Sequence, residues 1–252
     1  MIRFIAALLV ALVAGCSQPV DETKIPLTED ELKFVASHPT VAWALEENRP
    51  PYIFIEGGKP AGLSFDYLEL IAKKTGLKFS PVKTGNFTDS ITALRNGRVD
   101  VMTTIRPTPE SSGFMGFTPP IAYQGGVFAF RINTLPRSPM TTGILKDSAA
   151  KSYLQARFPE MNLIETVDDE QSISLLHKGL LDGVITDAAT INYFNSKSNV
   201  KTRSAIINFD YPYSFAYRRD DTMLGSIMAK AVNSISPDDK ERIKQKWLKE
   251  EK

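Results

Sequence analysis

The chain has 252 residues, and its 30 lysines and arginines are almost balanced by 29 aspartates and glutamates, giving a formal net charge of +1. A balance this even argues against a nucleic-acid partner, which normally requires a basic surface. Two histidines and one cysteine provide no zinc-binding constellation, and a single cysteine excludes a disulfide within the chain. The length suffices for one large or two modest domains stabilised by packing alone.

The segment 1–15 has the pattern of a secretory signal peptide. Arg3 provides one positive charge ahead of the apolar run 4–14, which is too short to span a bilayer. The run LVAGC at 12–16 resembles a bacterial lipobox, which implies a mature protein that begins at a lipidated Cys16. The alternative is a buried N-terminal helix, which is disfavoured because globular helices usually show a polar face.

The polar segment 16–27, with two prolines, is expected to act as a tether between the lipid and the folded domain. In lipoproteins an aspartate directly after the cysteine retains the protein at the inner membrane, and this chain has Ser17 there. The resemblance therefore favours an anchor in the outer membrane slightly over the inner one. In either case we expect the domain to lie in the periplasm.

Beyond the tether, short apolar strands alternate with amphipathic helices, which is typical of an α/β fold. Helix starts are marked by a capping box at Thr28 to Glu31, by Asp168 with Gln171, and by Ser236 before a proline. The expected elements, in chain order, are a helix over 28–37, a strand over 41–45, a helix over 64–75, a strand over 77–81, a helix over 88–96, strands over 99–105, 125–131 and 142–145, helices over 148–158 and 168–178, strands over 183–186 and 214–218, and helices over 221–234 and from 236 onward.

Two segments of the chain have the same construction. Residues 94–100 and 176–182 both run from a helix end through a glycine and a short loop to an aspartate that precedes a strand. This repeated construction predicts two lobes of similar structure.

The sequence contains no catalytic or nucleotide-binding motif of a known kind: no Gly-x-Ser-x-Gly elbow, P-loop or dinucleotide fingerprint. His38 and His177 both lie near predicted helix ends, where we expect capping or solvated histidines rather than metal ligands. We therefore expect no metal, no cofactor and no catalysis, although a missing motif is weak evidence against an enzyme.

Short motifs follow one another in a fixed order along residues 28–249. They are VxW at 41–43, PPYIF at 50–54, GKPAGLSFDY at 58–67, TGNF at 84–87, ALRNGRVD at 93–100, TPE at 108–110, FTxP at 117–120, GxxDGxxxD at 179–187 and IxxxW at 243–247. Each motif is weak alone, but in this order they resemble the bacterial extracellular solute-binding proteins of family 3. The segments 27–39 and 234–237 further resemble the Venus-flytrap modules of some bacterial signalling enzymes.

This resemblance implies the two-lobed α/β fold of periplasmic binding proteins of type 2, with two crossover strands, near 126–131 and 205–209. Lobe one would be discontinuous, combining 28–128 with 208–252, and lobe two would span 129–207. A small polar ligand would bind in the cleft between the lobes, which close around it by a hinge motion.

The resemblance also assigns ligand-binding roles to individual residues. Tyr52 and Phe87 match the aromatic walls of the cleft, and Asp187 matches the acid that pairs with a ligand amino group. Ser148 lies where a hydroxyl and a helix N-terminus meet a carboxylate, and Glu46 matches an acidic cleft position. The alternatives are core packing for the two aromatic residues, a helix cap for Asp187 and a solvated loop for Glu46.

One position departs from the family pattern. Amino-acid binders of the family carry an arginine at the position three residues after Thr108, and its planar guanidinium binds a ligand carboxylate through two hydrogen bonds. This chain has Ser111 at that position. That departure weakens the case for a standard α-amino acid ligand. We hypothesise that Arg106 replaces the missing arginine. The alternative is that Arg106 is a solvent-facing loop residue. Thr103, Thr104 and Thr108 complete the ligand-binding residues expected on this segment.

The resulting prediction is a lipid-anchored periplasmic protein that captures a small polar ligand, amino-acid-like or anionic, by lobe closure. It would serve an ABC-type transporter permease or a membrane sensor, as a monomer and without a cofactor. The alternative is a periplasmic enzyme on the same fold, similar to cyclohexadienyl dehydratase.

Overall fold

The structure, a computed structural model, describes residues 24–38, 40–132 and 139–248. The expected signal peptide, Cys16 and most of the expected tether therefore lie outside the described residues. The last tether residues pack on the domain, because the Ile25 amide donates to the Lys74 carbonyl at 3.0 Å and Leu27 contacts the core. Within the described ranges, no helix is long and apolar enough to cross a membrane.

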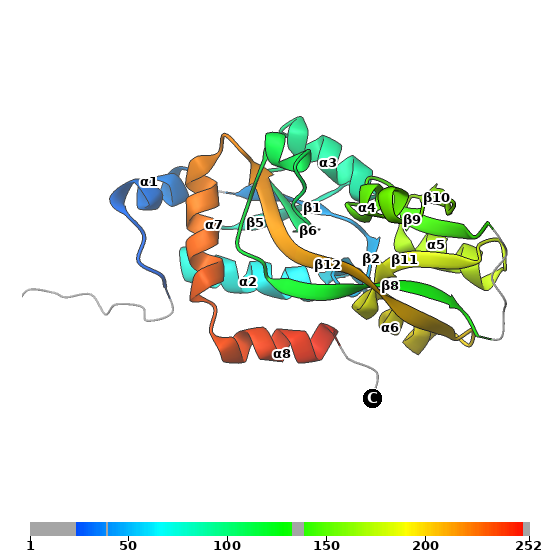
Figure 1. The fold of residues 1–252 in the computed structure, drawn as a ribbon. Helices are drawn as coiled ribbons and strands as arrows, with labels where there is room; N and C mark the ends of the chain where they lie inside the picture. The colour runs from blue at the N-terminus through cyan, green and yellow to red at the C-terminus, as the bar shows by residue number, and fades with distance from the viewer. Residues whose placement is uncertain (1–23, 39, 133–138, 249–252) are drawn as a thin grey trace, which may run out of the picture.

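The described residues form two α/β lobes (Figure 1), as predicted. Lobe one contains β1 (Val41–Leu45), β5 (Phe79–Lys83), β6 (Val101–Ile105), β7 (Met115–Phe117), α1 (Glu29–Ser37), α2 (Leu63–Thr75), α3 (Phe87–Arg95), α7 (Thr222–Ser234), α8 (Pro237–Trp247) and the short 3-10 helix η1 (Ser111–Gly113). Lobe two contains β9 (Thr141–Leu145), β10 (Asn162–Thr166), β11 (Gly183–Asp187), α4 (Ala150–Arg157), α5 (Asp169–His177) and α6 (Ala188–Lys197).

Two long strands connect the lobes, β8 (Ala122–Arg131) and β12 (Thr202–Arg218). They run antiparallel beside each other from one lobe into the other (Figure 1), and the hydrogen-bonded strand order is β10-β9-β11-β8-β12-β6-β1-β5, with β7 paired to β12. The ladder between them shifts register where residues 207–209 of β12 bulge opposite Gly126. The predicted lobe boundaries fall within these two strands, at 128/129 and 207/208.

A separate three-stranded sheet of β2 (Asn48–Arg49), β3 (Ile53–Glu56) and β4 (Lys59–Ala61) lies beside α2. The sequence analysis did not predict it, because strands of two to four residues are too short to show a period-two pattern. Gly62 ends this sheet and begins α2 with φ +118, a conformation that glycine alone adopts without strain. The sheet positions Arg49 and Tyr52.

The predicted helix starts are confirmed. Thr28 Oγ1 accepts from the Glu31 amide at 3.3 Å while Glu31 Oε2 accepts from the Thr28 amide at 2.8 Å, which completes the capping box. Asp168 caps α5 and Ser236 caps α8 through their side-chain oxygens. These features depend on neighbours three residues away, which is why the sequence alone reveals them.

Other elements differ from the sequence prediction. β5 begins two residues later than expected because Leu77 is buried ahead of the strand rather than within it. The strand expected over 214–218 is the end of the 17-residue β12. The strand β10 and the helix α6 were not predicted at all.

The largest core surrounds Trp43, Tyr67 and Phe215 of lobe one, all at most 2% exposed, and continues into lobe two through Ile144 and Ile185. Trp247 of α8 is half-buried against this core. Its indole Nε1 donates to Asp66 Oδ2 at 2.8 Å, so it joins α8 to α2.

Candidate functional site

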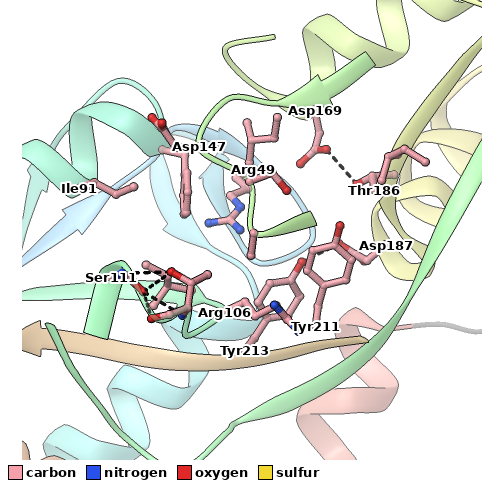
Figure 2. A pocket seen from close by; sticks show the side chains of 17 residues that line it. Arg49, Ile91, Arg106, Ser111, Asp147, Asp169, Thr186, Asp187, Tyr211 and Tyr213 are labelled. Atoms are coloured by element: carbon pink, nitrogen blue, oxygen red, sulfur yellow. Dashed lines mark hydrogen bonds between the residues drawn. The ribbon is translucent and has the colours of Figure 1, made fainter. Parts of the chain in front are cut away.

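A cavity of about 610 Å³, including its open mouth, lies between the two lobes. Its walls come from lobe one, from lobe two and from the connecting strand β12 (Figure 2). The residues that line it are Arg49, Phe87, Ile91, Ile105, Arg106, Thr108, Ser111, Leu145, Asp147, Ser148, Ala149, Asp169, Ile185, Thr186, Asp187, Tyr211 and Tyr213. Five of the predicted site residues are among them: Phe87, Arg106, Thr108, Ser148 and Asp187.

Arg106 follows β6 and reaches the cavity beside β12. Its Nε donates to the Asp210 carbonyl at 2.7 Å, and its guanidinium lies 4.1 Å from the centre of the Phe209 ring. Thr108 and Ser111 stabilise a turn between them, since the backbone amide of each residue donates to the hydroxyl oxygen of the other. The structure thus places Arg106 on the cavity wall, which is compatible with its hypothesised role and does not test it.

Asp187 lies at the end of β11, lines the cavity and is 2% exposed. It caps α6, because its Oδ1 accepts from the Thr190 amide at 3.0 Å and its Oδ2 accepts from Thr190 Oγ1 at 2.9 Å. Two phenols also donate to it, Tyr52 at 2.6 Å and Tyr213 at 3.0 Å. The helix-cap role considered as the alternative is therefore present, and a ligand amino group would compete with the two tyrosine hydroxyls.

Tyr52 does not line the cavity. It is 1% exposed, lies behind Tyr213 with ring centres 4.7 Å apart, and reaches the cavity only through its hydrogen bond to Asp187. Burial, and then the neighbouring Asp187 carboxylate, raise the pKa of Tyr52 well above its ordinary value, so its hydroxyl stays a donor. The bond joins lobe one to lobe two.

Glu46, Thr103 and Thr104 are fully buried and also lie outside the walls of this cavity. Glu46 instead lines a smaller adjoining pocket of about 230 Å³, open solvent included, and burial raises its pKa despite the nearby Arg49 guanidinium. Thr104 has a left-handed backbone with φ +48, and its carbonyl accepts from Arg49 Nη2 at 3.0 Å.

Ser148 lies two residues before α4, and its hydroxyl accepts from the Ala150 amide at 3.3 Å. The residue just before this serine, Asp147, has φ +59, in the left-handed region that favours glycine. Asp147 Oδ2 also accepts from Thr88 Oγ1 at 2.6 Å, a second contact between the lobes.

The sequence analysis missed several cavity residues, among them Arg49, Asp169, Tyr211 and Tyr213. Arg49 sits on a two-residue strand, and Asp169 follows the predicted cap of α5 without a motif of its own. Tyr211 and Tyr213 belong to β12, where aromatic residues at 209, 211 and 213 recur with the period of a strand, a pattern that points to one shared face. That alternation was the available sequence indication.

Asp169 is the acid with the most perturbed ionisation in the cavity. Burial and then the neighbouring Asp187 raise its pKa to about 6, against a weaker opposing effect of Arg49. Its Oδ1 accepts from Thr186 Oγ1 at 2.9 Å (Figure 2). The cavity thus combines two arginines from lobe one with aspartates from lobe two. Among the described residues, no group of three or more histidine, cysteine or acidic side chains is placed to hold a metal ion.

Comparison with known proteins agrees with this fold. The chain is 24% identical over 245 residues to the virulence sensor protein BvgS of Bordetella pertussis, an alignment that covers 92% of this chain and 20% of the sensor. The chain therefore spans about a fifth of that relative's length. The amino-acid-binding protein AabA of Dichelobacter nodosus is 28% identical over 124 residues, which cover 49% of this chain and 44% of AabA.

Among solved structures, the periplasmic domain of B. pertussis BvgS superposes with a TM-score of 0.84 at 23% identity, covering 90% of this chain and 46% of that one. This likeness supports the two-lobed fold. The sequence profile of one family matches residues 41–250, a range that contains lobe two, lobe one apart from α1 and its flanking residues, and every residue of the cavity wall. The chain belongs to the bacterial extracellular solute-binding proteins, family 3.

Proposed function

We propose that the protein captures a small polar ligand, amino-acid-like or anionic, in the cavity between its lobes and acts by binding, without catalysis. The observation that carries this proposal is the cavity itself, which both lobes line and where charged side chains of opposite sign converge. A concave site with a few convergent polar groups is what small-ligand binding requires. Hydrogen bonds from Tyr52 and Tyr213 to Asp187 and from Thr88 to Asp147 join the lobes across it.

Closure is the expected mechanism. We expect a true ligand to raise the unfolding free energy by about 2.7 kcal/mol at a concentration of one hundred times Kd, because it binds the folded state alone. It should also reduce the radius of gyration, since only contacts made with both lobes favour the closed arrangement. A thermal-shift screen over amino acids, polyamines, di-acids and sugar acids, followed by X-ray scattering with the compounds that bind, measures both effects.

Unchanged scattering at saturating ligand would contradict closure and indicate a rigid binding module. Turnover of prephenate or arogenate by the purified protein would contradict the proposed absence of catalysis and support the dehydratase alternative.

The partner of the protein is proposed from its relatives. The similarity to sensor proteins of Bordetella supports a membrane sensor that reads the occupied, closed form. The similarity to the amino-acid-binding protein AabA supports an amino-acid-like ligand. Delivery of that ligand to an ABC-type transporter is the second partner role that we propose. We further propose that the domain works in the periplasm, held at a membrane by lipid on Cys16.

The lipid anchor leads to a separate prediction. Changing Cys16 to Ala is expected to abolish lipid labelling, because the thiol is the attachment point, and to leave the protein uncleaved or released from the membrane. Fatty-acid labelling in a bacterial host and sequencing of the mature N-terminus measure this, with Ser17→Ala as a control that keeps the label. If the wild-type protein takes up no fatty acid and begins elsewhere, the anchor proposal is wrong.

A further inference from the structure

Arg49 is a buried cation on the wall of the cavity that lacks part of its hydrogen bonding. The residue is 8% exposed and lines both the main cavity and the smaller adjoining one. Its Nη2 donates to the Thr104 carbonyl at 3.0 Å. Among the residues that the structure describes, its Nη1 has no hydrogen-bond partner. A buried guanidinium donor without a partner costs free energy, so a group that accepts from it would be bound favourably.

The guanidinium is held in place before any ligand arrives. It lies 4.8 Å from the centre of the Phe87 ring and 5.9 Å from that of Tyr213, and Figure 2 shows it in the middle of the lining side chains. The carbonyl that fixes its Nη2 belongs to Thr104, whose left-handed backbone is strained for a β-branched residue. Backbone strain of this kind persists where it orients a functional group, and here it orients the Thr104 carbonyl toward Arg49.

One acid forms an ion pair with Arg49 among the described residues, but it leaves Nη1 without a hydrogen bond. Glu46 Oε2 lies 3.6 Å from Nη1, beyond hydrogen-bond distance, and Glu46 Oε1 has no hydrogen-bond partner in the described part of the chain. Arg106, by contrast, is partly exposed and already donates through Nε to a carbonyl. Of the two cavity arginines, Arg49 therefore has more to gain from an anionic partner.

The other charges of the cavity restrict what that anion can be. Asp147, Asp169 and Asp187 line the same space, so a doubly charged phosphate would be repelled more strongly than a group with a single negative charge. A carboxylate matches both this limit and the planar geometry of a guanidinium.

We propose that Arg49 binds the carboxylate of a small ligand through Nη1 and so replaces the family arginine that is absent at Ser111. This inference rests on the proposed solute-binding function and names the ligand class of that site. It assigns the role to a residue of β2 rather than to Arg106.

The experiment compares carboxylates with their amides. L-leucine, L-proline, succinate and benzoate are each titrated beside the corresponding primary amide, with putrescine and inorganic phosphate as cationic and polyanionic probes, by thermal shift and calorimetry. We expect at least one carboxylate to bind and its amide to bind about tenfold or more weakly, because the amide carries no charge for Arg49 to pair with.

Variants then locate the contact. Arg49→Gln should weaken binding of that carboxylate about tenfold or more, while Glu46→Gln should strengthen it because it removes the acid that competes for Nη1. Arg95→Gln is the matched control, since Arg95 also lies over a phenylalanine ring, 4.3 Å from the centre of Phe114, but outside the cavity. Opposite changes in affinity in the Arg49 and Glu46 variants would distinguish a lost ligand contact from a loss of structure. If Arg49→Gln does not fold, the affinity of the Glu46 variant tests the proposal.

Any of four results would overturn the proposal. The first two are equal binding of acid and amide, and unchanged affinity in folded Arg49→Gln. The other two are weaker or unchanged binding in Glu46→Gln, and a larger loss of affinity in Arg106→Gln than in Arg49→Gln. Binding of putrescine or phosphate alone would leave solute binding intact and refute only the carboxylate assignment. A complete lack of binding would refute this proposal, and the function would then be decided by the wider ligand screen.

Discussion

Replacing Gly62 by alanine is expected to lower the free energy of unfolding by roughly 3 kcal/mol or more. Gly62 has φ +118, which an L-residue with a side chain adopts only under strain. An added Cβ would also lie 2.4 Å from the carbonyl oxygen of Tyr52, and that backbone cannot move freely because its carbonyl accepts from the Ser64 amide at 2.9 Å. Urea unfolding followed by circular dichroism measures the loss.

Gly97→Ala is the matched control for this substitution. Gly97 also has a positive φ, +70, but a Cβ there would meet nothing within 4 Å, so only backbone strain of about 1–2 kcal/mol is expected. Equal losses at the two positions would show that the contact with Tyr52 contributes nothing.

Asp169→Asn is expected to stabilise the empty protein by up to about 3 kcal/mol above pH 6. The folded protein raises the pKa of Asp169 to about 6 from an ordinary value of 3.8, mainly by burial. Between these pH values the folded state binds more protons than the unfolded state, so the stability that the protonated carboxyl contributes is lost as pH rises through about 6. Asparagine removes that loss and can still accept from Thr186 Oγ1. Unfolding measured from pH 3.5 to pH 8 should therefore show a gain that disappears below about pH 4.

The neighbouring Asp168 provides a control of opposite sign. Its side chain caps α5 by accepting from the Gln171 amide at 2.7 Å, so Asp168→Ala should cost about 1 kcal/mol near neutral pH. A gain for Asp169→Asn that does not change with pH would contradict the ionisation argument and point to packing instead.

The parts of the fold that follow from local sequence were predictable. The caps at Thr28, Asp168 and Ser236 depend on residues within one helical turn, and all three are present. The two lobes were predicted from the repeated construction of 94–100 and 176–182, and the crossover strands between them from the family resemblance that the order of motifs carries. The short sheet that carries Arg49 was missed because its strands are fixed by pairing with one another, and no periodicity marks them.

The candidate site was predictable only in part, for a physical reason. Phe87, Arg106 and Asp187 were named from positions in motifs and do line the cavity. Tyr52 was expected at the wall but lies behind it, since a motif gives a residue's place along the chain and not its depth. Arg49 gains its importance from the Thr104 carbonyl, 55 positions later in the chain, and such a contact leaves no local trace.

The bulge at 207–209 of β12, opposite Gly126 of β8, bears on the entropy of binding. On either side of it the ladder is regular, so we expect the torsions that change in the proposed closure to be concentrated in these few residues. Fixing the backbone of one residue costs about 1–2 kcal/mol, and we therefore expect closure to cost only a few kcal/mol in lost conformational freedom. With the proposed closure arranged in this way, we expect most of the contact energy to remain as affinity, so that even a small ligand could close the two lobes.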